Sequence, residues 1–375
     1  MRSETFRSDG HIRLGYIDWA KALGIIFICM GHILPTGAPL KVLLYCFHVP
    51  LFAFVGGMLN RPTATRKDLA RKLWKTATRL LVPYTLWFWI FCMPYFVDVP
   101  LARHLGVYGE LNLGELVQRF FFLEGKTIWN NALWFVPCYF LVCVIFGLFC
   151  HITRGNAAAS GGVGIASLVL FAFLEKKEFT FSLGELNNFL GLGNVLLLFG
   201  FFAVGYALRW FVWDVQHSVQ KPCTNPYLYA ALVAFVGMAI AALRLNARQD
   251  SKRYNAISLL NRDYNDPAVF VSLSLCLVIT FVLICGFLPQ CKFADLLSRH
   301  SFFVMSTHYA VFLIPFVYLV KRQADWQGAI RQGMWETACL IALYVAVLVV
   351  LDKLWRKHPS RSLSHVLHAL GILCA

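Results

Sequence analysis

Long apolar stretches recur along the whole chain and set the expected fold. A helix needs about 20 predominantly apolar residues to cross a bilayer, and ten stretches meet or approach that length. The pattern therefore predicts an all-α, polytopic membrane bundle of about ten transmembrane helices, with both termini in the cytoplasm. The predicted spans are residues 15–35, 41–59, 80–98, 129–150, 160–174, 190–212, 227–245, 268–288, 301–320 and 334–352.

Composition agrees with this class. Only 14% of the 375 residues are charged and 59% are hydrophobic, whereas soluble domains carry about 25% charged residues. No segment is polar enough to form a separate soluble domain, so residues 1–375 are expected to form a single membrane domain. Its ends are a polar cytoplasmic tail, 1–13, and a basic tail, 353–375.

The net charge of +15 does not require a nucleic-acid partner. With ten spans and internal termini, more than half of the Lys and Arg residues fall on the cytoplasmic side, as the positive-inside rule expects. Residues 61–79 alone hold seven of them. Apolar residues recur among these cations at helical spacing, which predicts an interfacial helix on anionic lipid. Lipid anchoring alone would also explain that helix.

The first span contains Asp18, Lys21 and His32. Charged groups at the centre of a membrane span cost at least about 2.5–3.5 kcal/mol and usually mark function. Eleven residues bring a helix back to within about 20° of its starting direction, so Lys21 and His32 share a face, about 16 Å apart along the axis. The simpler interpretation is that Asp18 and Lys21, three residues apart, form a structural salt bridge near the inner surface.

Further polar groups lie in other spans. His48 of the second span is expected at a depth comparable to that of His32, because consecutive antiparallel spans are neighbours. Ser301 and His308 are seven residues apart and share a helix face. Trp134 opens the fourth span. Imidazoles near one depth suit general base catalysis or binding of a polar ligand, although buried structural histidines and an interfacial tryptophan remain alternatives for each position.

Several other site classes have no support in the sequence. Most of the twelve cysteines lie within apolar spans and are expected to be small buried side chains. No CxxC pair or zinc-ligand spacing occurs, so no metal is expected. No Walker A motif occurs either, which argues against ATP-driven transport.

Five segments carry a resemblance to a known family. YIDWAKALGIIFICMGH, with Lys21 and then His32 eleven residues later, resembles the first-span signature of the integral-membrane acyltransferase 3 family. FHVPLFAFVGGML resembles the second span of its sugar O-acetyltransferase branch. TRLLVPY, LWFVPCYFL and SFFVMSTHYAVF resemble later family segments, and all five occur in the family's order between residues 16 and 313.

This resemblance implies transfer of an acyl group, usually acetyl, from cytoplasmic acetyl-CoA or another acyl-CoA to a hydroxyl of a cell-envelope glycan or lipid-linked sugar. It also implies a bacterial inner membrane. The implied catalytic residues are His32, as general base or acyl carrier, Lys21, which stabilises negative charge on the donor, and Asp18, which orients Lys21. Lys75 and Arg79 are expected to bind coenzyme phosphates, and His48, Trp134, Ser301 and His308 to line the acceptor site.

A secondary transporter or flippase for a glycan precursor or small solute is the alternative, because intramembrane charges also mark transport paths. Against it, the hydropathy pattern shows no inverted repeat and no paired broken spans.

Overall fold

The computed structural model describes residues 14–34, 38–97, 113–121, 130–179, 189–217, 226–246, 257–259, 262–308, 326–357 and 370–371. Within these ranges the chain forms helices and connecting loops, with one isolated bridge between Ser258 and Asp263. The α-helices are α1 (Gly15–Ile33), α2 (Pro39–Leu59), α3 (Arg66–Val97), α5 (Leu113–Phe121), α6 (Phe135–Ile152), α7 (Ala157–Lys176), α8 (Leu192–His217), α9 (Pro226–Leu245), α10 (Pro267–Ile284), α11 (Lys292–Arg299), α12 (Ser301–Thr307) and α14 (Trp326–Lys357). Three short 3-10 helices are η1 (Asn131–Trp134), η2 (Phe189–Gly191) and η4 (Cys285–Phe287).

The predicted fold class is confirmed. Eight helices of the described part are long and apolar enough to cross a membrane, and they coincide with eight of the ten predicted spans. Of the other two, 80–98 falls within α3 apart from its last residue. Residues 309–320 of the predicted span 301–320 lie outside the described residues, as do the tail 1–13 and most of the tail 353–375.

The basic segment predicted at 61–79 does not form a helix of its own. The side chain of Thr65 accepts a hydrogen bond from the Asp68 backbone N–H at 3.1 Å, so α3 begins at Arg66 and then continues to Val97. At 1.5 Å per residue, these 32 residues extend about 48 Å. That length exceeds the roughly 30 Å hydrocarbon core of a bilayer, so one helix can hold both the basic segment and an apolar span.

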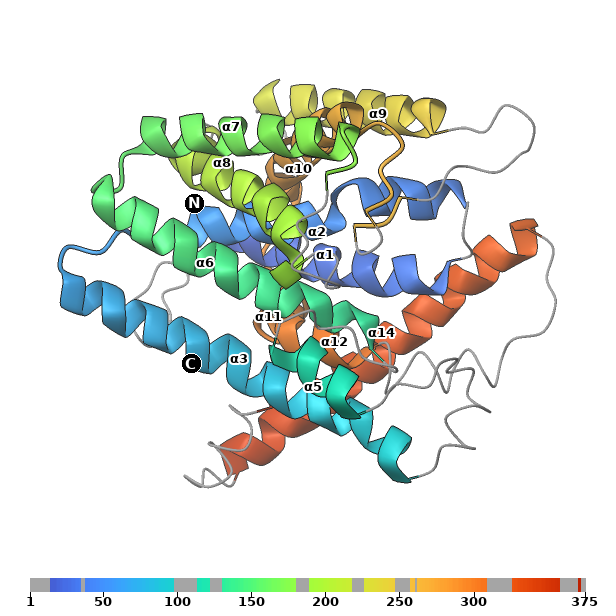
Figure 1. Cartoon of the computed structure of the whole chain (residues 1–375). Coiled ribbons are helices and arrows are strands. Elements are labelled where there is room, and N and C mark those ends of the chain that lie inside the picture. Colours follow the sequence, from blue (N-terminus) through green and yellow to red (C-terminus); the bar gives the residue numbers. More distant parts are fainter. Residues whose placement is uncertain are drawn as a thin grey trace.

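The helices form two packed groups that share α1 and α6 (Figure 1). In the first group, α2 packs against α1, α8 and α10, while α7 covers α8 and α9 covers α10. In the second, α3 packs on α6, and α11, α12 and α14 pack on α1. The end of α1 and the start of α6 therefore lie where the two groups meet.

Close approach between α2 and α8 depends on glycine. A Cβ on Gly57 would overlap the carbonyl of Phe202, and one on Gly205 would overlap the carbonyl of Phe54. Small residues let membrane helices approach to backbone contact, where dispersion rather than the hydrophobic effect holds them together. This contact fixes α2, and with it His48, against the rest of the bundle.

Pro50 removes one backbone hydrogen bond from α2, the one that residue 50 would donate to the carbonyl of Cys46. Proline has no N–H, so that carbonyl loses its usual partner four residues later. The hydroxyl of Ser274, on α10, donates to it instead. The carbonyl that Pro50 leaves unpaired, close to His48, thus gains a partner from a neighbouring helix. Inside a membrane, such backbone groups need a partner within the protein.

The bundle has two ends with different connections. At one end, on the left of Figure 1, the links 60–65 and 153–156 lie together, and His151 contacts Thr63 at 3.1–3.2 Å. At the other end, Lys41 of α2 donates to the carbonyl of Leu34 at 2.9 Å, after the last turn of α1. The basic half of α3 starts at the first end, and the last turn of α1, which contains His32, lies at the second.

Candidate active site

Three histidines from three helices come together inside the bundle. His32 lies in the last turn of α1, His48 in α2, and His308 directly follows α12. The rings of His32 and His308 have centroids 5.1 Å apart. The ring of Tyr45 lies near those of both His32 and His48. Its centroid is 6.2 Å from that of His32 and 4.8 Å from that of His48. The structure therefore brings together residues that are 276 positions apart in the chain.

Two of the rings are held by backbone carbonyls. Nδ1 of His48 donates to the carbonyl of Leu44 at 2.6 Å, and Nδ1 of His308 donates to the carbonyls of Met305 and Val304 at 2.8 and 3.1 Å. Such a bond fixes the tautomer and leaves Nε2 as the lone-pair nitrogen of a neutral imidazole. Nε2 of His308 is buried and has no hydrogen-bond partner among the described residues. It is therefore a hydrogen-bond acceptor that no described residue satisfies, on a ring that lies beside His32.

A cavity of about 110 Å³ adjoins these rings. Two of the three histidines, His32 and His48, line it directly, together with Tyr45 and Ser258 as further polar groups. The rest of the wall is apolar or aromatic, which excludes bulk water while leaving few polar contacts to orient a ligand. These apolar lining residues are Ile28, Val49, Phe52, Ala132, Trp134, Phe135, Leu259 and Met305.

Asn130, which lies before η1, organises one side of this cavity. Its side-chain oxygen accepts from the Ala132 backbone N–H at 3.1 Å, and its amide donates to the carbonyl of Ser306. The first bond caps the short helix that carries Trp134; the second ties this helix to α12 just before His308. Its role as a connector was not evident from the sequence, because an asparagine at the start of a predicted span is also an ordinary helix cap.

Lys41 is a second residue that the sequence analysis missed. Its ammonium lies 5.4 Å from the centroid of the Tyr45 ring, and therefore close to the histidine cavity. A lysine at the start of a membrane span normally indicates only an interfacial anchor. Its contact with a cavity-lining ring appears only when α1 and α2 are placed side by side.

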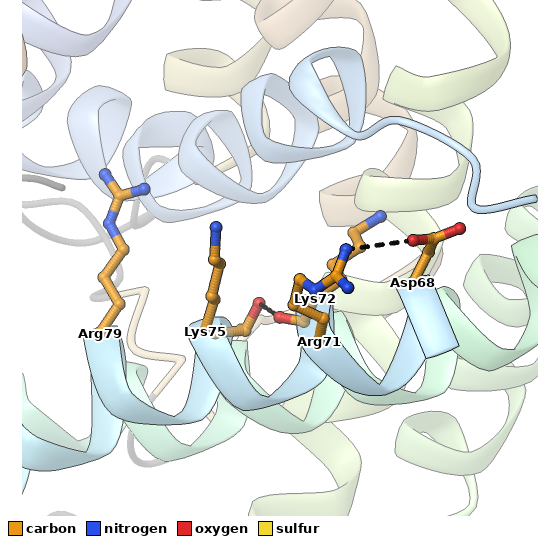
Figure 2. Close-up of a pocket in the computed structure, with 6 residues that line it drawn as sticks. Asp68, Arg71, Lys72, Lys75 and Arg79 are labelled. Carbon is orange, nitrogen blue, oxygen red and sulfur yellow. Dashed lines mark hydrogen bonds and ion pairs between the residues drawn. The ribbon is translucent and has the colours of Figure 1, made fainter. Parts of the chain in front are cut away.

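A second depression, of about 280 Å³, follows the basic half of α3 (Figure 2). We call it the basic groove. Lys75 and Arg79 are four residues apart, so they share a helix face, and Figure 2 shows both side chains pointing to the same side of α3. The groove is lined by Asp68, Arg71, Lys72, Lys75, Thr76 and Arg79. Thus Lys75 and Arg79, both predicted from the sequence, lie in one open depression.

The four cations of the groove differ in their existing contacts. Arg71 pairs with Asp68 at 3.3 Å. Lys72 donates to the side chain of Asn60 at 2.7 Å and to a backbone carbonyl, and burial lowers its pKa. No described carboxylate pairs with Lys75 or Arg79. These two are therefore the cations that the groove offers to an anionic ligand.

Aromatic side chains of α6 extend from the cavity toward the groove. Phe135 lines the cavity and stacks on Tyr139, with centroids 5.3 Å apart and planes 20° apart. Tyr139 lies within electrostatic range of Arg79. Two stacked rings of α6 thus extend from the cavity wall toward the side of α3 that carries Arg79.

Three predicted site residues lie elsewhere. Asp18 accepts a hydrogen bond from the hydroxyl of Ser298, on α11, at 2.7 Å. Ser301 donates to the carbonyl of Ser298 at 3.0 Å, at the junction of α11 and α12. Neither they nor Lys21 line the histidine cavity or the basic groove. Asp18 and Ser301 have structural contacts that join α1, α11 and α12.

The described residues contain no cluster of three or more His, Cys, Asp or Glu side chains with metal-binding geometry. The three histidines described above therefore do not form such a cluster. Their arrangement suits proton transfer and hydrogen bonding.

Comparison with known proteins identifies the family. A family model described as an acyltransferase domain, that of the acyltransferase 3 family, matches residues 14–353. Searches of curated proteins and of solved structures found no significant match. The match covers both the histidine cavity and the basic groove, together with all eight described membrane-spanning helices. The chain belongs to the acyltransferase 3 family and is a membrane acyltransferase.

Proposed function

We propose that this protein transfers an acyl group, acetyl in the first instance, from cytoplasmic acyl-CoA to a hydroxyl of a cell-envelope glycan or lipid-linked sugar. The observation that carries the proposal is the histidine cavity, which His32 and His48 line, with the His308 ring centroid 5.1 Å from that of His32. Acyl transfer to an alcohol needs a base near the hydroxyl, and neutral imidazole is the side chain best suited to that task near pH 7.

His32 is the proposed general base. It takes the proton of the acceptor hydroxyl while that oxygen forms an ester bond with the acyl carbon, and it releases the proton to the departing sulfur. His48, which lines the cavity, and His308, whose ring lies beside that of His32, are proposed to help orient the acceptor. In the second form of the proposal, a nitrogen of His32 carries the acyl group covalently between donor and acceptor.

The basic groove is the proposed binding site for the phosphates of the donor. Lys75 and Arg79 face one side of an open depression and have no described carboxylate partner. Ammonium and guanidinium groups bind phosphate through charge-assisted hydrogen bonds. When bound there, the coenzyme supplies an acyl carbon activated as a thioester. Lys21, on the same face of α1 as His32, is proposed to stabilise negative charge on that donor, and Asp18 to orient it.

The arrangement of the two sites supports this division of roles. The groove starts at the end of the bundle that holds the links 60–65 and 153–156, which the charge pattern assigns to the cytoplasm. His32 lies near the end of α1, toward the opposite face. In the inner membrane of a bacterium, a donor would thus enter from the cytoplasm, and a glycan or lipid-linked acceptor from the outer side.

The first test measures donor binding, which does not require the acceptor. Acetyl-CoA is titrated into the detergent-purified protein by calorimetry, and Lys75→Ala and Arg79→Ala should each weaken binding about twofold to fivefold, because one exposed charged contact contributes up to about 1 kcal/mol. Lys67→Ala is the matched control, because Lys67 is an exposed cation of the same helix outside the groove. Equal effects at all three positions would reject the groove as the donor site.

The second test concerns His32. Membranes containing the chain receive acetyl-CoA with a radiolabelled acetyl group, and alkali-labile label in the envelope fraction is counted. His32→Asn should lose transfer, whereas His151→Asn, near the opposite end of the bundle, should retain it. Full transfer by a folded His32→Asn protein would refute the catalytic assignment. Export of a glycan without its modification would favour the transporter alternative.

A further inference from the structure

A short non-helical segment between α9 and α10 enters the bundle. Within its described residues, the side chains of Ile257, Leu259 and Tyr264 are only 4%, 3% and 4% exposed. Connections normally run over the surface, because buried non-helical backbone leaves polar groups without partners. In membrane proteins such backbone is tolerated where it is enclosed by protein or lines a cavity. Burial of this segment therefore indicates a specific role in the bundle.

Polar groups of the segment form hydrogen bonds with one another and with a neighbouring helix. Ser258 and Asp263 exchange two backbone hydrogen bonds of 2.8 and 2.9 Å, which closes it into a small loop. The hydroxyl of Tyr264 donates to the side chain of Asn194, on α8, at 3.2 Å. The loop is thus held in one conformation from within and from one neighbouring helix.

Arg262 ties the loop to a second helix. Its Nε donates to the carboxylate of Glu175, on α7, at 2.9 Å, and its Nη2 donates to the carbonyl of Phe179 at 2.6 Å. The side chains of Arg262 and Glu175 are only 14% and 8% exposed. A guanidinium in a buried, multiply bonded pair has a defined geometry that a surface ion pair lacks. The ion pair therefore fixes the position of the loop relative to α7.

The inner edge of the same loop reaches the histidine cavity. Ser258 and Leu259 line it together with His32 and His48. Accepting the acyl transfer proposed above, we propose that Ser258 and Leu259 form the part of the cavity wall that selects the acceptor. In this assignment Ser258 determines which hydroxyl-bearing group fits beside His32, and Arg262 is a positioning residue that holds this wall in place.

The cavity size restricts the acceptor class. Its volume of about 110 Å³ is well below the roughly 300–1,000 Å³ of pockets that enclose a whole drug-sized ligand. Aromatic rings of Tyr45, Phe52 and Trp134 form part of its wall, and the flat faces of a sugar ring pack on such surfaces. The acceptor therefore presents a single sugar-sized unit at His32, and the rest of the glycan or lipid stays outside.

A substitution at the inner edge tests the wall directly. In the membrane assay with radiolabelled acetyl-CoA, Ser258→Trp should lower transfer at least about tenfold by filling the cavity, while the affinity for acetyl-CoA stays unchanged. Asp263→Trp is the matched control, because Asp263 belongs to the same bridge but is exposed. It should transfer at the parent's rate. Full transfer by Ser258→Trp would overturn the inference and leave the proposed function standing.

The role of Arg262 is tested by measuring the KM for the acceptor and the KM for acetyl-CoA separately. Arg262→Ala should raise the KM for the membrane acceptor about tenfold or more and leave the KM for acetyl-CoA unchanged, and Arg262→Lys should recover part of the loss. A merely structural role would alter both KM values together, and that result would overturn the positioning role. If the parent protein itself transfers no label, the proposed function fails, and the inference fails with it.

Discussion

Removing the hydroxyl of Ser274 should destabilise the bundle, because it leaves the carbonyl of Cys46 without a hydrogen bond. Pro50 denies this carbonyl its usual partner within α2, and Ser274 replaces that partner from α10. Ser274 is fully buried and Cys46 is 1% exposed, so water cannot substitute. A buried acceptor left unsatisfied costs about 1–3 kcal/mol, and Ser274→Ala should lower the free energy of unfolding by that amount.

The matched control is Ser272→Ala. Ser272 is an exposed residue of the same helix, and its hydroxyl donates at 2.8 Å to the Ala268 carbonyl of its own turn. That carbonyl keeps its backbone partner when the hydroxyl is removed, so the expected change is within about 0.5 kcal/mol. Unfolding is followed in detergent micelles by near-UV circular dichroism with increasing denaturant.

A double-mutant cycle isolates the mechanism. Pro50→Ala restores an N–H that donates to the Cys46 carbonyl, so the Ser274→Ala change should cost at least about 1 kcal/mol less in the Pro50→Ala background than in the parent. Equal costs in the two backgrounds would refute the reasoning, as would a Ser274→Ala protein as stable as Ser272→Ala.

Other parts of the structure give further predictions. Lys75→Glu should weaken acetyl-CoA binding more than Lys75→Ala does, and the difference should shrink as salt rises from about 0.05 to 0.5 M; an unchanged difference in calorimetry would contradict a phosphate contact. Asn130→Ala should reduce transfer in the membrane assay, because η1 loses both its cap and its tie to α12; transfer at the parent's rate would show that this tie is dispensable. Gly205→Val should destabilise the protein by at least about 1–3 kcal/mol, because its side chain meets the Phe54 carbonyl. Gly237→Val, at a glycine with nothing within 4 Å, is the control for the same unfolding measurement.

The sequence was a good guide to the elements and to part of the site. Span lengths depend only on local hydropathy, so eight predicted spans recur as helices of the described residues. Lys75 and Arg79 are four residues apart, and helical periodicity alone placed them on one face. Hydropathy also predicted two separate helices at 61–79 and 80–98. The structure has one continuous helix there, α3, because a change from polar to apolar composition does not end a helix.

Long-range packing decided the rest. His32 and His308 meet only because α11 and α12 pack on α1, and no periodicity within a span predicts which helices are neighbours. Ser301 shares a helix face with His308, but only the His308 ring lies beside His32, whereas Ser301 bonds to the turn before it. Position on a helix face therefore did not establish membership of the site.

By itself, the sequence determined the membrane class, most of the helices and the family, since these follow from local hydropathy and from short motifs. The tertiary structure alone decided which polar groups face one cavity. In a membrane protein, lipid-facing and protein-facing surfaces are both apolar, so hydropathy does not distinguish them. The segment that carries Ser258 and Leu259 illustrates this limit. Its place in the wall of the cavity depends on bonds from Arg262 to α7 and from Tyr264 to α8, which join residues 70 or more positions apart.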